Sequence, residues 1–288
     1  MELGSVYAIL GSSVTLVEMT GGLMPGADRD LMNSFVKQTG DLFEAVYLNT
    51  TPTFHEQDNG IEVGFKGEHE KDGPTRFDKV LLTVGRRPNV ENLGLERTGV
   101  RQDEKGTIAV DGQRRTHEPS IYAIGDVAGA PLPAHKATHE GRVAAEAIAG
   151  HPTVYEPRAM PAVEYTDPEV AWCGLTETEA REQGRDVTVT KFPWAASGRA
   201  VTLGHADGLT KLVLDSQTGR ILGVGIVGTQ AGELISEGAL AVEMAATASD
   251  VANTIHPHPT LSETLMEAAE AFEGTATSFY RPKRKKKE

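Results

Sequence analysis

The chain opens on a helical pattern that is followed by an alternating one. Residues 3–10 carry apolar side chains at i, i+3, i+4 and i+7, and Gly11 follows as a helix-ending residue. Residues 13–16 alternate between polar and apolar side chains, which predicts a short strand that ends at Glu18. Because no capping residue or loop precedes the helical pattern, we expect Met1 to be an internal methionine of a longer polypeptide.

The other patterns of the first half alternate between helix and strand. A nearly continuous apolar run over residues 78–84 predicts a buried strand of the parallel type. The remaining predicted elements are a helix over 28–44, strands over 46–56, 61–66 and 121–124, and an alanine-rich helix over 135–149. This alternation of strands and helices indicates the α/β class.

A change in composition divides the chain near its middle. Residues 150–161 contain four prolines or glycines in twelve positions, which predicts a domain boundary. Beyond it the predicted layout is α+β. Its elements are strands near 169–175, 186–192, 209–215 and 220–228, a hairpin turn over 215–219, and helices over 231–247 and 261–272.

Charge and composition narrow the class of protein. The 288 residues have a formal net charge of −13, but the tail over 281–288 holds six cations and one anion, so residues 1–280 carry 22 cations against 40 anions. The excess of negative charge over residues 1–280 argues against nonspecific nucleic-acid binding. We interpret the tail as a solvated end. No Lys or Arg precedes Arg29 and no 18-residue apolar run occurs, so we expect a cytoplasmic protein.

Three strand ends carry residues typical of nucleotide-binding sheets. Glu18 has the position of the acidic residue that hydrogen-bonds the ribose of NAD, and its charge would repel the extra phosphate of NADP. The alternative is an ordinary exposed acid. Gly85 would let a cofactor approach the backbone closely; the alternative is a plain turn. Asp126 could accept a hydroxyl bond, and the next helix would offer backbone N–H donors around Ala134 and His135.

The second half contains one strong candidate for acid–base chemistry. In the run HPHPTLSE over 256–263, His258 lies between two prolines, which restrict the direction of its ring. Glu263 could accept from one ring nitrogen and orient the imidazole as a general base. Two alternatives remain open: Glu263 could instead complete a capping box with Thr260, or the histidine pair of 256 and 258 could bind a metal, although no further ligand cluster supports a metal site.

Four segments together resemble a known family. The sequence is similar to the flavin-dependent pyridine nucleotide-disulfide oxidoreductases, and most of all to their dihydrolipoyl dehydrogenase branch, the E3 component of 2-oxo acid dehydrogenase complexes. The segments are TVGRRPN at 83–89, IYAIGDVAG at 121–129, AHKA at 134–137 and HPHPTLSE at 256–263. The resemblance implies a partial NAD-binding domain over 1–84, a returning segment of a Rossmann-type FAD-binding domain over 85–151, an α+β interface domain for dimerisation over 152–280, and the basic tail over 281–288.

The resemblance also implies roles for single residues. Glu18 and Gly85 would contact NAD, and Asp126, Ala134 and His135 would contact FAD. His258 would be the acid–base residue, oriented by Glu263, and would reach into the partner's active site across a homodimer. The implied reaction oxidises dihydrolipoyl groups to lipoyl groups with reduction of NAD, in a 2-oxo acid dehydrogenase complex and without a metal.

One departure from the family limits this prediction. The family's paired redox cysteines have no counterpart here, because Cys173 is the single cysteine and lies in an apolar stretch typical of a core. The alternatives are therefore a noncatalytic remnant that dimerises with a full-length E3 subunit, another disulfide reductase of the same family, and, with less support, a stand-alone nucleotide binder.

Overall fold

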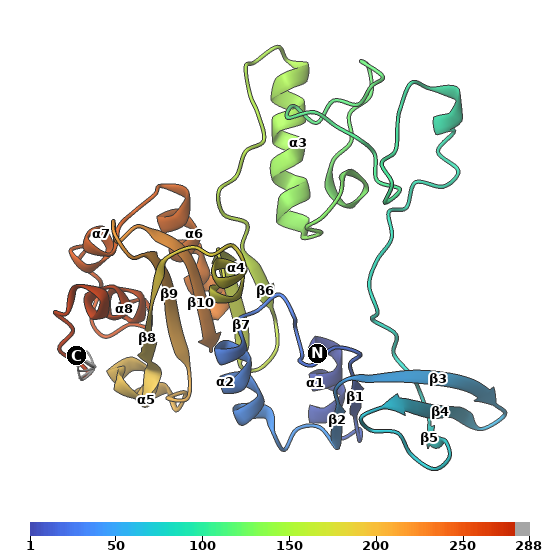
Figure 1. Ribbon diagram of the computed structural model, residues 1–288, viewed down its shortest axis with the longest axis horizontal. Helices are drawn as coiled ribbons and strands as arrows, with labels where there is room; N and C mark the ends of the chain where they lie inside the picture. The colour runs from blue at the N-terminus through green and yellow to red at the C-terminus, as the bar shows by residue number, and fades with distance from the viewer. Residues whose placement is uncertain (280–288) are drawn as a thin grey trace. The chain divides into compact units, whose positions relative to one another are not determined.

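A five-stranded antiparallel sheet organises the carboxyl-terminal half of the chain (Figure 1). The computed structural model describes residues 1–279, and the sheet has the strand order β6-β7-β10-β9-β8. These strands are β6 (Ala162–Glu164), β7 (Glu169–Gly174), β8 (Val187–Pro193), β9 (Leu209–Asp215) and β10 (Ile221–Gly228). The four longer strands confirm the predicted ones, and the predicted turn over 215–219 joins β9 to β10.

Helices cover both faces of this sheet. On one face lie α6 (Ala231–Glu243), α7 (Ala248–Ala252) and α8 (Glu263–Glu273), which enclose the larger apolar core with alternate residues of β7 and β10. On the other face α2 (Arg29–Thr39) packs Leu31 and Phe35 against the sheet. Gly225 of β10 permits this approach, because a Cβ there would lie 2.5 Å from Leu31 Cδ1.

The amino-terminal elements belong to the same compact unit, which comprises Met1–Val80 and the chain from Ala159 onward. They are α1 (Glu2–Ile9), the parallel pair β1 (Thr15–Val17) and β2 (Ala45–Tyr47), and the antiparallel strands β3 (Thr50–Gln57), β4 (Gly60–Gly67) and β5 (Thr75–Phe77). The predicted helix over 3–10 is confirmed. Its apolar side chains stay nearly half exposed or more: Leu3 50%, Val6 47%, Tyr7 47% and Leu10 76%.

Leu81–Arg158 form the second unit, which has little regular structure outside one helix. That helix, α3 (Ala134–Ile148), confirms the predicted one. It is accompanied by the short 3₁₀ turns η1 (Leu95–Arg97) and η2 (Gly125–Ala128).

Two predicted strands are wrong. Residues 78–84 form no strand, and Val84 is 92% exposed. Residues 121–124 make only one isolated bridge, between Tyr122 and Arg115. An apolar run becomes a strand only where a neighbouring strand satisfies its backbone groups, and no strand among residues 1–279 pairs with either segment.

Several short elements were not predicted from the sequence. They are β5, β6, α4 (Glu177–Glu182), α5 (Gly198–Leu203) and α7. Two of these helices begin with capping boxes, at Thr176 with Glu179 and at Thr247 with Asp250, and this signal could have found them.

The two compact units divide the chain after Val80 and after Arg158. The domain boundaries expected after residues 84, 151 and 280 stay predictions, and the predicted basic tail lies outside the described residues. Within residues 1–279, no helix combines the length and apolar character needed to cross a bilayer.

Candidate functional site

The pair His258 and Glu263 lies where the loop after α7 meets α8. Glu263 is the first residue of α8, and its Oε1 lies 2.9 Å from His258 Nδ1. A carboxylate can only accept hydrogen bonds, so Nδ1 carries the proton and Nε2 of the neutral ring is an acceptor. The His258 side chain is 79% exposed and that of Glu263 only 20%, so an anchored carboxylate holds an accessible base.

The two roles considered for Glu263 coexist. Its second oxygen, Oε2, accepts the backbone N–H of Thr260 at 2.7 Å, which is half of the expected capping box. The other half does not form among the described residues, because the Thr260 hydroxyl donates to the carbonyl of Pro257 at 2.7 Å instead. The bond to Thr260 fixes the carboxylate, and the fixed carboxylate in turn orients His258.

His256 has a different environment from His258. Its side chain is only 4% exposed, with Nε2 2.7 Å from Glu237 Oε1 and Nδ1 2.8 Å from the carbonyl of Thr254. Each histidine therefore has its own carboxylate, on a different helix. Among residues 1–279 no cluster of three potential metal ligands occurs, so nothing in the described chain supports the alternative of a metal site.

In the second unit, a buried ion pair holds the loop that carries Asp126 against α3. Glu140 Oε2 accepts the N–H of Gly125 at 2.6 Å, and Lys136 Nζ donates to the carbonyls of Gly125 at 3.0 Å and Gly129 at 2.9 Å. Lys136 and Glu140 also pair with each other at 3.1 Å and are 3% and 0% exposed. No role was predicted for these two residues, although opposite charges four residues apart on a predicted helix indicate an ion pair.

The geometry around Asp126 suits binding of hydroxyl and phosphate groups. Its carboxylate is 48% exposed and lies 3.8 Å from Arg86. Helix α3 starts at Ala134 and His135 without a side-chain cap, so the positive end of its dipole lies at this first turn. Gly125 has φ +73° and a Cβ there would lie 3.0 Å from that of Ala137, so only glycine fits this turn.

Glu18 and Gly85 lie in different units. Glu18 directly follows β1, and its backbone bonds to Tyr47 and Thr50 hold it between neighbouring strands. Its Oε1 accepts the N–H of Thr20 at 2.7 Å, and the side chain is half-buried. Gly85 is exposed with φ +124°, a conformation that favours glycine. The NAD contacts of Glu18 and Gly85 stay predictions.

The lone cysteine belongs to the core, as expected. Cys173 lies on β7, is 2% exposed, and its burial raises the pKa of the thiol to about 12. A thiol is nucleophilic only as the thiolate. Cys173 is therefore inert at neutral pH and does not replace a catalytic cysteine.

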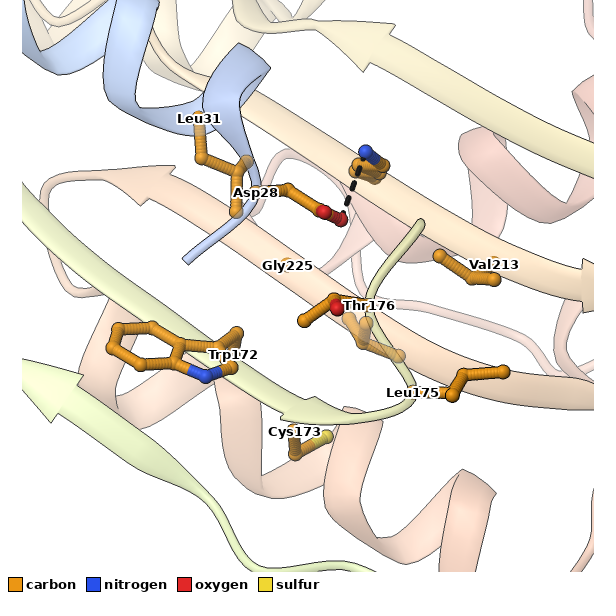
Figure 2. A pocket seen from close by; sticks show the side chains of 10 residues that line it. Asp28, Leu31, Trp172, Cys173, Leu175, Thr176, Val213 and Gly225 are labelled. Atoms are coloured by element: carbon orange, nitrogen blue, oxygen red, sulfur yellow. Dashed lines mark ion pairs between the residues drawn. The ribbon is translucent and has the colours of Figure 1, made fainter. Parts of the chain in front are cut away.

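A small cavity next to Cys173 has a charged wall (Figure 2). Its volume is about 10 Å³, which is room for one water at most, so it is no substrate site. In its wall Lys211, 1% exposed, contacts Asp28 at 2.9 Å, Asp30 at 2.9 Å and Glu177 at 2.7 Å. Lys191 also pairs with Asp30. The cluster joins α2 to the sheet and to α4. It was not predicted from the sequence.

Comparisons with known proteins cover both units. Residues 1–141 match the family described as pyridine nucleotide-disulphide oxidoreductase, and residues 160–269 match the dimerisation domain of the same name. The chain is 46% identical over 287 residues to dihydrolipoyl dehydrogenase of Vibrio cholerae, a match that covers 100% of this chain and 60% of the relative. It is 49% identical over 277 residues to that of Thermus scotoductus, covering 94% of this chain and 59% of the relative. The chain thus spans about 60% of the length of these relatives.

Solved structures of disulfide reductases are also similar to this chain. LpdA from Mycobacterium tuberculosis is 26% identical with a TM-score of 0.85, covering 94% of this chain and 58% of that one. The HOCl-induced flavoprotein disulfide reductase RclA from Escherichia coli is 26% identical with a TM-score of 0.83, covering 93% of this chain and 61% of that one.

Proposed function

Because the chain belongs to the pyridine nucleotide-disulphide oxidoreductase family, we propose that it is the acid–base and dimerising part of a dihydrolipoyl dehydrogenase. The proposed reaction takes two electrons and two protons from a dihydrolipoyl dithiol, which closes to the lipoyl disulfide. NAD receives both electrons and one proton as hydride, and the second proton leaves through the enzyme. When bound, FAD would relay the electrons between the thiols and NAD.

The observation that carries this proposal is the bond between His258 Nδ1 and Glu263 Oε1 at 2.9 Å. With the proton held on Nδ1, Nε2 accepts the proton of a substrate thiol and produces the thiolate that attacks a disulfide. Glu263 stabilises the imidazolium that results. Because Cys173 is buried, the disulfide under attack belongs to residues other than these 288.

The cofactor contacts are part of the same proposal. We assign Glu18 and Gly85 to NAD. Asp126 and the first turn of α3, at Ala134 and His135, are assigned to FAD, because an exposed carboxylate suits its hydroxyl groups and the positive end of a helix dipole suits its phosphate groups.

The match of residues 160–269 to a dimerisation domain supports a homodimer. The 79% exposure of the His258 side chain suits a base that acts at a site completed by the second subunit. Assembly with a 2-oxo acid dehydrogenase complex, and a cytoplasmic location, remain parts of the proposal.

A chimaera tests the function. This chain would replace the matching 60% of the Vibrio cholerae enzyme, and the chimaera should bind flavin and reduce NAD with dihydrolipoamide. His258→Gln should lower kcat by about 10²–10⁴-fold with flavin retained, whereas His205→Gln, at an exposed histidine of the same unit, should change nothing. A flavin-loaded chimaera that is inactive, or equally active with His258→Gln, contradicts the proposal.

A second candidate is a noncatalytic dimerisation module, favoured by the burial of the single cysteine. It predicts that the 288-residue chain co-purifies with a full-length E3 subunit.

A further inference from the structure

The two ring nitrogens of His256 both face hydrogen-bond acceptors. Nε2 lies 2.7 Å from the carboxylate oxygen Oε1 of Glu237, on α6. Nδ1 lies 2.8 Å from the backbone carbonyl of Thr254, two residues earlier in the chain. Neither a carbonyl nor a carboxylate can donate a proton, so both bonds require an N–H on the ring.

Only the imidazolium form of His256 satisfies this geometry. A neutral imidazole has one N–H and would turn a lone pair toward one of the two oxygens. The His256 side chain is 4% exposed, so water has little access to its ring, whereas the 35% exposed Glu237 keeps access to solvent as a carboxylate. The pair is therefore a largely buried ion pair with two charge-assisted bonds.

This ion pair lies next to the proposed base. Ile255 and Pro257, on either side of His256, are exposed, and Ile255 is 95% exposed. The next buried apolar side chain is Leu261, two residues before α8. His256 is thus the inward anchor of the segment from which His258 projects, and Leu261 is the anchor beyond it.

We propose that His256 is a positioning residue. As a cation bonded to Glu237, it connects the loop before α8 to α6. This connection fixes the backbone that carries His258. The inference rests on the proposed function for His258. His256 itself points into the protein and touches no reacting atom, so its effect is on the geometry of the base and on kcat.

The protonation state can be measured in the unmodified 288-residue chain. Nitrogen-15 imidazole spectra at neutral pH should show both ring nitrogens of His256 protonated, with His256→Gln used only to assign the signals. A ring with one unprotonated nitrogen overturns the proposal. This measurement needs neither flavin nor activity.

The positioning effect is tested by Glu237→Gln, which keeps the shape and an oxygen but removes the charge. The Thr260 N–H, which bonds to Glu263, should then exchange about tenfold faster. The matched control is Glu233→Gln, which removes the same charge from an exposed position one turn earlier on α6 and should leave this exchange unchanged. Equal exchange rates in the two variants overturn the proposal.

In the chimaera, Glu237→Gln should lower kcat for dihydrolipoamide about tenfold at unchanged KM and flavin content. A fall in Tm with unchanged kcat would mean a merely structural role. The two proposals fail separately. An active His258→Gln enzyme refutes the function while the spectra of His256 are unaffected, and a neutral His256 refutes the positioning while the function stands.

Discussion

Glu263 Oε1 lies 2.9 Å from Nδ1 of His258, and both residues are held by the same turn of chain at the start of α8. The carboxylate is fixed from its other side by a backbone N–H donated to Oε2 at 2.7 Å. A hydrogen bond that caps the helix thus also sets the direction of the ring.

Glu263→Gln should separate these two roles. The amide oxygen can still accept from Thr260, but the amide nitrogen then faces His258 Nδ1 and requires it to accept, which moves the neutral-ring proton to Nε2. We expect kcat of the chimaera to fall about 10²-fold with Tm nearly unchanged, measured by dihydrolipoamide-dependent NAD reduction and thermal unfolding. Full activity would show that Glu263 is only a cap.

Lys211→Met should destabilise the unit that contains the sheet. The variant leaves three carboxylates, Asp28, Asp30 and Glu177, without their shared buried cation. Breaking a buried ion pair costs about 3–5 kcal/mol, and we expect a loss at the lower end because Lys191 still pairs with Asp30. Urea unfolding measures the loss.

The control for Lys211→Met is Lys37→Met, at an exposed position of α2. It should change the free energy of unfolding by less than about 0.5 kcal/mol. Similar losses in the two variants would contradict a stabilising role for the cluster.

Acid should weaken the same cluster. Burial alone would raise the pKa of Asp28 and of Asp30. Hydrogen bonds outweigh burial and lower both pKa values. Asp28 accepts them from the Glu177 backbone and from Lys211, and Asp30 accepts them from Lys191 and Lys211. Their contribution to stability is complete above the unfolded pKa of about 4 and is lost as pH falls through the lower folded values.

Urea unfolding between about pH 2 and 5 checks this dependence. Lys211→Met removes a cause that the two aspartates share, so the variant should lose less stability than the unmodified chain over that range. The same slope in both proteins would contradict the assignment.

Cys173 should resist modification in the folded chain. Its thiol has a pKa of about 12 and is 2% exposed, so almost no thiolate is present or reachable at pH 8. Mass spectrometry should find no alkylation by iodoacetamide in buffer and complete alkylation in urea. Rapid alkylation of the folded protein would refute the core assignment.

The isolated 288-residue chain should be colourless and inactive. With one buried cysteine it has no disulfide to receive electrons from a dithiol. Visible absorbance should show no flavin, and dihydrolipoamide should produce no NADH. Stoichiometric FAD together with turnover would contradict this expectation.

Local patterns determined much of this protein. The four long strands of the sheet follow from apolar runs bounded by turn residues, and α3 and α8 follow from helical spacing. The five-residue separation of His258 and Glu263 was short enough for the sequence to predict their contact. It could not show that one carboxylate bonds both the ring and the chain at Thr260.

Tertiary structure decided what depends on distant neighbours. The run over 78–84 is as apolar as the true strands but finds no partner strand within the described residues, so composition alone misidentified it. His256 and His258 look equivalent in sequence, yet His256 is buried beside a carboxylate 19 residues away while His258 faces solvent. Lys211 reads as an ordinary strand residue until folding brings Asp28 beside it, because burial and charge pairing are properties of neighbours in space.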